Sequence, residues 1–207
     1  MKRIAGLMWA ACLGLSTAGH ARIPACPVLV IYSSGEPYKT ISEISAAEAD
    51  AVSSATPKSW NCRIAAEKIG EAFRGMGYPV RVAPVDSIRD CREIVGCGIV
   101  VFGMPARFWN VGWEMKRFID VHIGKIYIAA KPEFRKCAIG GFAMAEIPAS
   151  AEAALETFGR ALADCGTKFR ATEVFLTGEN PDSGRVRAGI QRMIASLTAA
   201  ESPAIAQ

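Results

Sequence analysis

The chain alternates short apolar runs with longer amphipathic segments from residue 27 onward. Val28–Tyr32 (VLVIY) is continuously apolar, which is typical of a parallel strand covered on both faces. Apolar runs predict four more strands, at residues 79–82, 98–103, 137–142 and 173–177. Helical periodicity and stop signals predict four main helices, at residues 61–76, 111–122, 150–165 (with Ser150 as its cap) and 183–197.

Strands that alternate with helices of these lengths predict an α/β domain with helices on both faces of a parallel sheet. The pattern matches a doubly wound five-stranded parallel sheet of order 2-1-3-4-5, over residues 27–197, with a flexible tail at 198–207. Such sheets bind ligands outside the carboxyl ends of their strands, at the switch between strands one and three. We therefore expect the site in the segments that follow Tyr32, Gly103 and Phe142.

A long insertion separates the first strand from its helix. Residues 35–60 occupy this connection, whereas about two to six residues are usual between a strand and a helix. The insertion lies at the expected ligand end of the sheet. It is either a functional segment or a disordered flap, and the sequence leaves both open.

The N-terminus resembles a secretory signal peptide. Lys2 and Arg3 form a short basic start, residues 4–15 are apolar, and small residues around Ala21 supply a cleavage site. The apolar run is short for a transmembrane span. We therefore expect residues 1–21 to be a leader and the mature chain to be exported, to the periplasm in a bacterial host; an ordinary N-terminal helix is the alternative.

Charge and cysteine content narrow the function classes. The formal charge is +4, and removing Lys2 and Arg3 with the leader leaves 22 basic against 20 acidic residues. This balance, without a basic run, does not indicate a nucleic-acid surface. Neither of the two histidines belongs to a metal-binding pattern, so no metal is expected. Six of the seven cysteines follow the leader, and they are either disulfide-bonded, with Cys91–Cys97 as the expected local bridge, or reduced.

The most informative motif follows the third predicted strand. Pro105 stiffens the chain as it leaves the sheet, and the next residues combine a permanent cation with adjacent aromatic rings: Ala106, Arg107, Phe108, Trp109 and Asn110. Backbone groups in such a loop can meet the polar edge of a flavin ring while the aromatic side chains cover its face. A hydrophobic lid with a surface arginine is the alternative.

The stretch GIVVFGMPARFWNVGWEMKRFID (residues 98–120) resembles the third strand, flavin loop and helix of the flavodoxin superfamily. It is most similar to WrbA-type NAD(P)H:quinone oxidoreductases, whose loop reads Pro-Thr-Arg-Phe-Gly-Asn-Met. The resemblance implies a flavodoxin-like fold, FMN as cofactor, and Ala106, Arg107 and Phe108 at the positions of the family's Thr, Arg and Phe. Ala106 lacks the hydroxyl of that threonine.

The same resemblance implies a phosphate-binding loop after the first strand. Ser33, Ser34 and Gly35 fit its start, and Glu36 places a negative charge beside it. Because of the insertion, the loop is expected to be split, with its second half before the next helix at Lys58, Ser59 and Asn61. Loss of phosphate binding, with Asn61 serving only as a helix cap, is the alternative.

Two further parts of the site are expected by resemblance. Phe142, Ala143 and Met144 begin the third loop, whose backbone amides could contact the flavin. Tyr127 falls near an aromatic residue that borders the family's substrate pocket, to which Trp109 would also belong. A half-exposed structural role for Tyr127 is the alternative.

Three functions agree with this pattern. The first is an FMN-dependent oxidoreductase that passes two electrons to a quinone-like acceptor, without an acid–base catalytic residue; a homo-oligomer is an open expectation for it. The second is an exported, non-enzymatic flavodoxin-type carrier that exchanges electrons with a redox protein. The third is a flavin-free binding module in which the cofactor loops have decayed.

Overall fold

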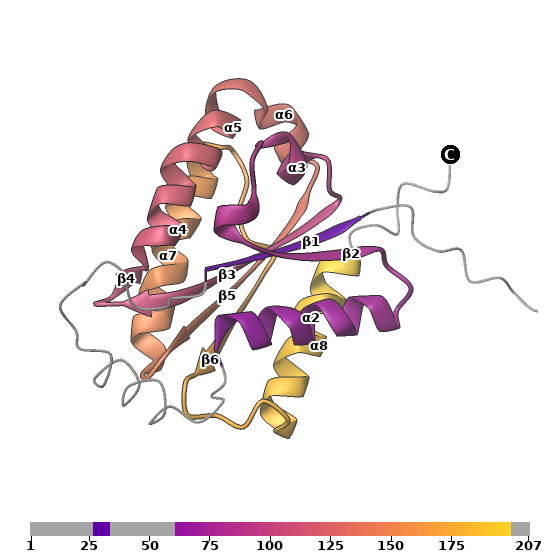
Figure 1. The fold of residues 1–207 in the computed structure, drawn as a ribbon, viewed down its shortest axis with the longest axis vertical. Helices are drawn as coiled ribbons and strands as arrows, with labels where there is room; N and C mark the ends of the chain where they lie inside the picture. Colours follow the sequence, from indigo (N-terminus) through magenta and orange to yellow (C-terminus); the bar gives the residue numbers. More distant parts are fainter. Residues whose placement is uncertain (1–26, 34–60, 200–207) are drawn as a thin grey trace, which may run out of the picture.

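The computed structural model describes residues 27–33 and 61–199 (Figure 1). Its five parallel strands are β1 (Val28–Tyr32), β2 (Val80–Pro84), β3 (Ile99–Arg107), β5 (Ala138–Ala145) and β6 (Ala171–Leu176). They lie in the order β2-β1-β3-β5-β6, and the two-residue strand β4 (Asn110–Val111) pairs antiparallel with the end of β3. The predicted α/β class with a parallel sheet is therefore confirmed.

The predicted count of five strands is wrong, because the described residues form six. Strand β3 runs past Gly103 to Arg107, and the chain then folds back as β4. When β4 is set aside, the parallel strands follow the expected spatial order. Strand β1 is an interior strand: Tyr32 lies opposite Pro84 on one side and Gly103 on the other.

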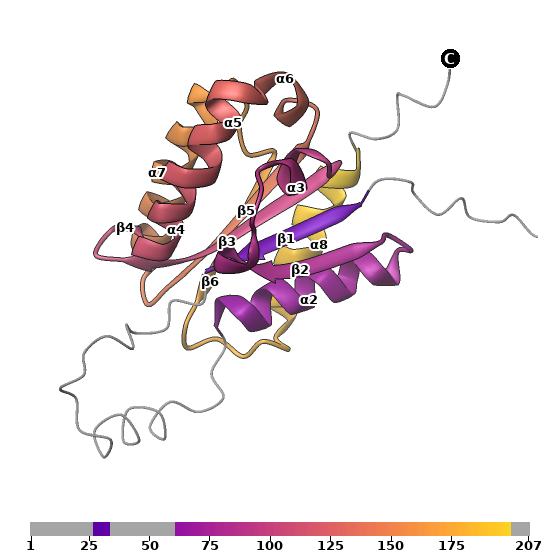
Figure 2. The same ribbon diagram turned by 45° about the horizontal axis from the view of Figure 1, so that its top comes forward.

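Helices cover both faces of the sheet (Figures 1 and 2). They are α2 (Cys62–Gly75), α3 (Arg92–Val95), α4 (Trp113–Phe118), α5 (Gly124–Ala129), α6 (Lys131–Phe134), α7 (Pro148–Asp164) and α8 (Gly184–Thr198). Helices α2 and α8 lie on one face, and α4 and α7 on the other. A π-helical turn at Ile119–Ile123 joins α4 to α5. Within the described residues, no helix is both long and apolar enough to span a bilayer.

Each face of the sheet has its own apolar core. Along β3, Val100 and Phe102 point toward α4 and α7, whereas Ile99 and Val101 point toward α2 and α8. This alternation is the two-residue period of a strand buried on both faces. Burial of one such large apolar side chain contributes about 1.5–3 kcal/mol, so the two cores fix the positions of the strand ends.

The N-termini of α2 and α8 begin where the sequence predicts, whereas that of α7 does not. Asn61 Oδ1 accepts a hydrogen bond from Ile64 N at 3.0 Å, and Ser183 caps α8 in the same way. The prediction that Ser150 caps the next-to-last helix is wrong, because α7 already begins at Pro148. Proline at the first helical position needs no amide hydrogen bond, which places Ser150 inside the first turn.

The cysteines of the described residues are free thiols: Cys62, Cys91, Cys97, Cys137 and Cys165. Cys97 donates its thiol hydrogen to Glu93 O at 3.2 Å instead of bonding to Cys91. The expected Cys91–Cys97 bridge is therefore absent from this structure.

The predicted domain boundaries are partly described. Helix α8 extends to Thr198, one residue beyond the predicted end of the domain, and the predicted leader lies outside the described residues.

Candidate functional site

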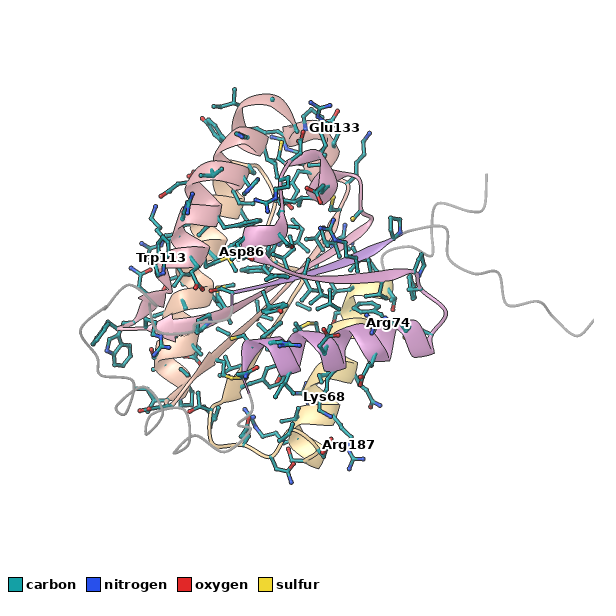
Figure 3. The ribbon with its side chains drawn as sticks, viewed as in Figure 1. Lys68, Arg74, Asp86, Trp113, Glu133 and Arg187 are labelled. Atoms are coloured by element: carbon teal, nitrogen blue, oxygen red, sulfur yellow. The ribbon has the colours of Figure 1, made fainter. Side chains whose placement is uncertain are left out.

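Several segments meet at the carboxyl edge of the sheet. The end of β1, the β3–β4 hairpin, the N-terminus of α2 and the start of α7 all lie at this edge (Figure 1). Helix α7 packs against β4, and Trp113 begins α4 beside the hairpin (Figure 3). This is the switch point between β1 and β3, where a doubly wound sheet binds its ligands.

The hairpin is the most unusual feature of this edge. Ala106 lies opposite Val111, and Arg107 lies opposite Asn110, which leaves a two-residue turn at Phe108 and Trp109. Both turn residues have positive φ, 47° and 63°. Such turns favour Asn-Gly, because L side chains are strained in the left-handed region. Placing Phe108 and Trp109 at these positions therefore strains the backbone. Their side chains are exposed, so packing within this structure does not offset that strain.

The aromatic rings of this turn are open to solvent. Phe108 is 98% exposed and Trp109 is 56% exposed. Below them, Pro105 and Ala106 are half-buried, and Gly112 N donates to Pro105 O at 3.2 Å, which closes the base of the hairpin. Strained, exposed residues on a rigid base are characteristic of ligand-contacting segments.

Arg107 brings positive charge to the N-terminus of α2. Cys62, the first residue of α2, is buried, and burial raises the pKa of its thiol to about 12. The positive charge of Arg107 acts against this rise in the pKa, and the negative charge of Glu114 adds to it. Both charges therefore lie within electrostatic reach of the Cys62 thiol at the start of α2; a contact of Arg107 with a flavin stays a prediction.

A Ser33–Glu114 hydrogen bond ties β1 to α4. Ser33 is fully buried, its amide donates to Gly103 O at 2.9 Å, and its hydroxyl donates to the Glu114 carboxylate. Sequence reasoning singled out Ser33 but missed Glu114. The available signal was an acidic residue in the first turn of the helix that directly follows the aromatic loop.

The two halves of the expected phosphate loop are only partly described. Ser34, Gly35, Lys58 and Ser59 lie outside the described residues. Asn61 uses its side-chain oxygen to cap α2, which confirms the capping role and leaves a phosphate contact as a prediction.

The third expected loop is corrected by the structure. Phe142, Ala143 and Met144 lie inside β5, and their side chains are buried. Their backbones pair with β3 and β6, and the Phe142 ring lies so close over Gly103 that a Cβ there would approach it to 2.1 Å. The strand ends three residues later than the predicted boundary at 142, so the chain leaves the sheet at Glu146.

Tyr127 and Trp109 do not share a pocket in this chain. Tyr127 is half-exposed on α5, at the far end of α4 from the hairpin (Figure 2). The helical rise between Trp113 and Tyr127 alone is about 20 Å. Lys131 Nζ lies 3.5 Å from the centroid of the Tyr127 ring, which supports the structural role. The hairpin residues remain as the aromatic candidates.

No cluster of three His, Cys, Asp or Glu side chains suited to a metal ion occurs in residues 27–33 and 61–199. The candidate site therefore consists of an aromatic hairpin, a nearby cation and carboxylate, and the start of α2. It offers ring-stacking surfaces and backbone polar groups rather than a nucleophile or metal ligands.

Comparison with known proteins identifies the fold. No family model matches the chain, and no curated protein matches it. Among solved structures, a WrbA-like flavodoxin from Agrobacterium tumefaciens has a TM-score of 0.60 at 13% identity, with 85% of this chain and 98% of that chain covered. A flavodoxin from Streptococcus pneumoniae TIGR4 has a TM-score of 0.59 at 12% identity, covering 84% of this chain and 99% of that one.

A flavodoxin from the domain Archaea gives a similar result, with a TM-score of 0.54 at 13% identity and coverage of 84% of this chain and 99% of that one. The fold is therefore flavodoxin-like, and WrbA-like proteins are among its structural neighbours. At these identities the likeness establishes the fold alone.

Proposed function

We propose that this protein is a flavin-binding redox protein that holds FMN at the carboxyl edge of the sheet and passes two electrons to a quinone-like acceptor. The observation that carries the proposal is the β3–β4 hairpin, in which two exposed aromatic residues occupy strained positions beside Arg107. A planar, apolar ligand with a polar edge suits this arrangement. A bound flavin would supply the electron-transfer chemistry that the side chains of this chain lack.

The residues of the hairpin fit a flavin ring. Phe108 and Trp109 supply ring faces that exclude water, and Trp113 adds a third, partly exposed aromatic side chain nearby. Arg107 supplies a charge that favours the more negative, reduced form of a flavin. Ala106 offers backbone groups but no hydroxyl, so orientation of the ring depends more on backbone contacts.

The phosphate would lie toward the start of α2. This helix has fourteen residues and no acidic residue in its first turn, so its N-terminal amides and dipole favour an anion. Asn61 satisfies one of these amides. Lys58 and Ser59 precede this helix in sequence, which supports the split phosphate loop.

Carriage of electrons between proteins is the second candidate function. Its specific support is the almost complete exposure of Phe108, which leaves an aromatic edge open to a protein surface. The predicted leader adds to this support, because an exported chain would draw electrons from a redox protein or a quinol rather than from NAD(P)H. Export of the mature chain is part of the same proposal.

The proposal is tested by titrating the cofactor-free chain with FMN and following quenching of flavin fluorescence. Trp109→Ala should weaken binding about tenfold, because an aromatic contact of this kind contributes on the order of 1.4 kcal/mol. Ile128→Ala, an exposed residue on α5, is the matched control and should not change binding. Equal affinity of all three chains would exclude the hairpin as the flavin site.

The two candidate functions are separated on the FMN-loaded chain. Bleaching of the flavin by NAD(P)H, followed by return of its colour with a soluble quinone, supports the oxidoreductase. Bleaching only by a strong chemical reductant or a reduced redox protein supports the carrier.

A further inference from the structure

Two cysteines lie side by side at the amino edge of the sheet, opposite the candidate flavin site. Cys97 connects α3 to β3, and Cys137 connects α6 to β5. The Cys97 thiol donates to Glu93 O, four residues earlier, at 3.2 Å, and the Cys137 thiol, which lies 3.8 Å from Glu133 O, donates at 3.0 Å to Cys97 O. Helices α3 and α6 are neighbours in both ribbon views, and Glu133 is labelled at this end in Figure 3. Each cysteine thus lies in the short turn between a helix and a strand, and the two strands, β3 and β5, are neighbours in the sheet.

The strand register brings these cysteines within bridging range. Ile99 lies opposite Ala138, and Ala138 N donates to Gly98 O at 2.7 Å. Cys137 Sγ lies 3.0 Å from the carbonyl oxygen of Cys97. Neighbouring strands lie about 4.8 Å apart and each residue advances about 3.3 Å along a strand, so continuing this register back by one and two residues puts the Cys97 and Cys137 Cα atoms about 5.8 Å apart. Disulfides join residues whose Cα atoms are about 4.4–6.8 Å apart, so side-chain rotation is the main change that a bond requires.

We propose that Cys97 and Cys137 form an intrachain disulfide when the folded chain meets a disulfide oxidant such as oxidised glutathione. Cys97 is half-buried and Cys137 is buried, so Cys97 meets the oxidant first. Its thiolate attacks the oxidant, forms a mixed disulfide and releases one glutathione thiol. The Cys137 thiolate then attacks the Cys97 sulfur and releases the second. Two electrons and two protons pass from the cysteine pair to the oxidant.

The bridge would close a loop that contains the whole candidate hairpin. The two cysteines are forty positions apart, and the segment between them includes β3, β4 and α4. Closing a loop of this length restricts the unfolded chain and stabilises the folded one. Burial raises the pKa of the Cys97 thiol, and it raises that of Cys137 to about 11. Both groups are therefore mostly protonated near neutral pH, and bridge formation should be slow there and faster in alkaline buffer.

The bridge is tested on the full chain by peptide mapping. The chain is incubated with oxidised glutathione, remaining thiols are alkylated in denaturant, and the protein is digested with trypsin. Basic residues place each candidate cysteine in its own peptide: Cys91 in residues 90–92, Cys97 in 93–107, Cys137 in 137–160 and Cys165 in 161–168. We expect peptide 93–107 linked to peptide 137–160. A link between 90–92 and 93–107, or no link to 137–160 at saturating oxidant, would overturn the proposal.

A thermal measurement provides an independent test. Oxidation should raise the midpoint of thermal unfolding of the wild-type chain, and addition of dithiothreitol should reverse the rise. The same rise should persist in Cys91→Ser and disappear in Cys97→Ser, whose hydroxyl can keep the hydrogen bond to Glu93 O. A rise that survives in Cys97→Ser would contradict the proposal. Neither test depends on flavin binding.

Discussion

The hydroxyl of Ser33 donates a hydrogen bond to the carboxylate of Glu114, and this contact joins the end of strand β1 to the helix that follows the aromatic hairpin. Ser33 is fully buried, and its amide is bound to Gly103 O. The pair therefore fixes the distance between β1 and α4 at the switch point of the sheet. It also places a negative charge at the edge where the flavin is proposed to bind.

Ser33→Ala should lower the free energy of unfolding by about 1–3 kcal/mol, because a carboxylate loses a buried donor. Glu114→Gln should cost less, since its amide oxygen still accepts the bond. Urea unfolding of Ser33→Ala, of Glu114→Ala, which removes the acceptor, and of the double variant Ser33→Ala/Glu114→Ala measures the coupling between the two side chains. Strictly additive losses would show that the contact contributes nothing to stability.

Charges at the edge should shift the potential of a bound flavin in opposite directions. Arg107→Ala removes a cation that favours the reduced form, so it should lower the two-electron midpoint potential, by roughly 30 mV for each 1.4 kcal/mol of lost stabilisation. Glu114→Gln removes an anion and should raise the potential. Spectroelectrochemical titration of the FMN-loaded chains measures both shifts.

The matched control for these shifts is Arg74→Ala. Arg74 lies in the last turn of α2, away from the hairpin (Figure 3), and its removal should leave the potential unchanged. Equal shifts in Arg107→Ala and Arg74→Ala would mean that net charge, rather than the position of Arg107, sets the potential.

The hairpin should show a conflict between stability and binding. Trp109→Gly and Trp109→Ala both remove the aromatic face, so both should weaken FMN binding. Glycine adopts positive φ without strain, whereas alanine does not, so the glycine variant should be more stable than the alanine variant by about 1 kcal/mol. Urea denaturation alongside FMN titration separates the two effects. A glycine variant no more stable than the alanine variant would indicate that the turn is unstrained.

His122 should make the fold sensitive to mild acid. Its Nδ1 is buried without a hydrogen-bond partner among the described residues. Lys125, in the adjoining α5, and the carboxylates of Glu93 in α3 and Asp90 just before α3 lie within electrostatic reach of it. Burial lowers its pKa below the usual 6.5. Because the unfolded chain then binds a proton more readily, the free energy of unfolding should fall as the pH drops below 6.5.

His122→Phe should flatten the pH dependence of stability in this range. The quantity to measure is the slope of the unfolding free energy against pH, obtained by urea denaturation at several pH values. A loss of packing in the variant lowers the free energy equally at every pH and leaves this slope unchanged. The pKa of Glu93 is lowered to about 2, chiefly by its hydrogen bond to Arg81, and the stability linked to it is lost only as the pH falls below 4.5. An unchanged slope between pH 5 and 6.5, about the region where histidine titrates, would exclude His122 as its source.

Regular elements could be predicted from the sequence because their signals are local. The apolar run Val28–Tyr32 and the caps Asn61 and Ser183 each depend on a few neighbouring residues. The aromatic residues were singled out from the residues themselves and from resemblance, but the prediction that Pro105 leaves the sheet is wrong, because β3 continues to Arg107. The shape of this segment as a β-hairpin was not foreseen, because neither Phe108 nor Trp109 favours the positive φ that the two-residue turn requires.

The errors at the site concern contacts between distant segments. Glu114 was missed because its hydrogen bond to Ser33 spans 81 positions. Met144 was placed in a loop because the sequence does not show that β5 keeps pairing with β3 as far as Pro105. Tyr127 was assigned to the pocket by resemblance, whereas the continuous helical path from α4 to α5 carries it to the other end of the domain.

The most direct test of the flavin-binding proposal is the visible spectrum of the purified full chain after incubation with excess FMN and removal of free flavin by gel filtration. We expect a flavin absorption band that co-elutes with the protein at one flavin per chain and is strongly reduced for Trp109→Ala. A colourless wild-type protein under saturating FMN would contradict the proposal and would favour a flavin-free binding module built on the same fold.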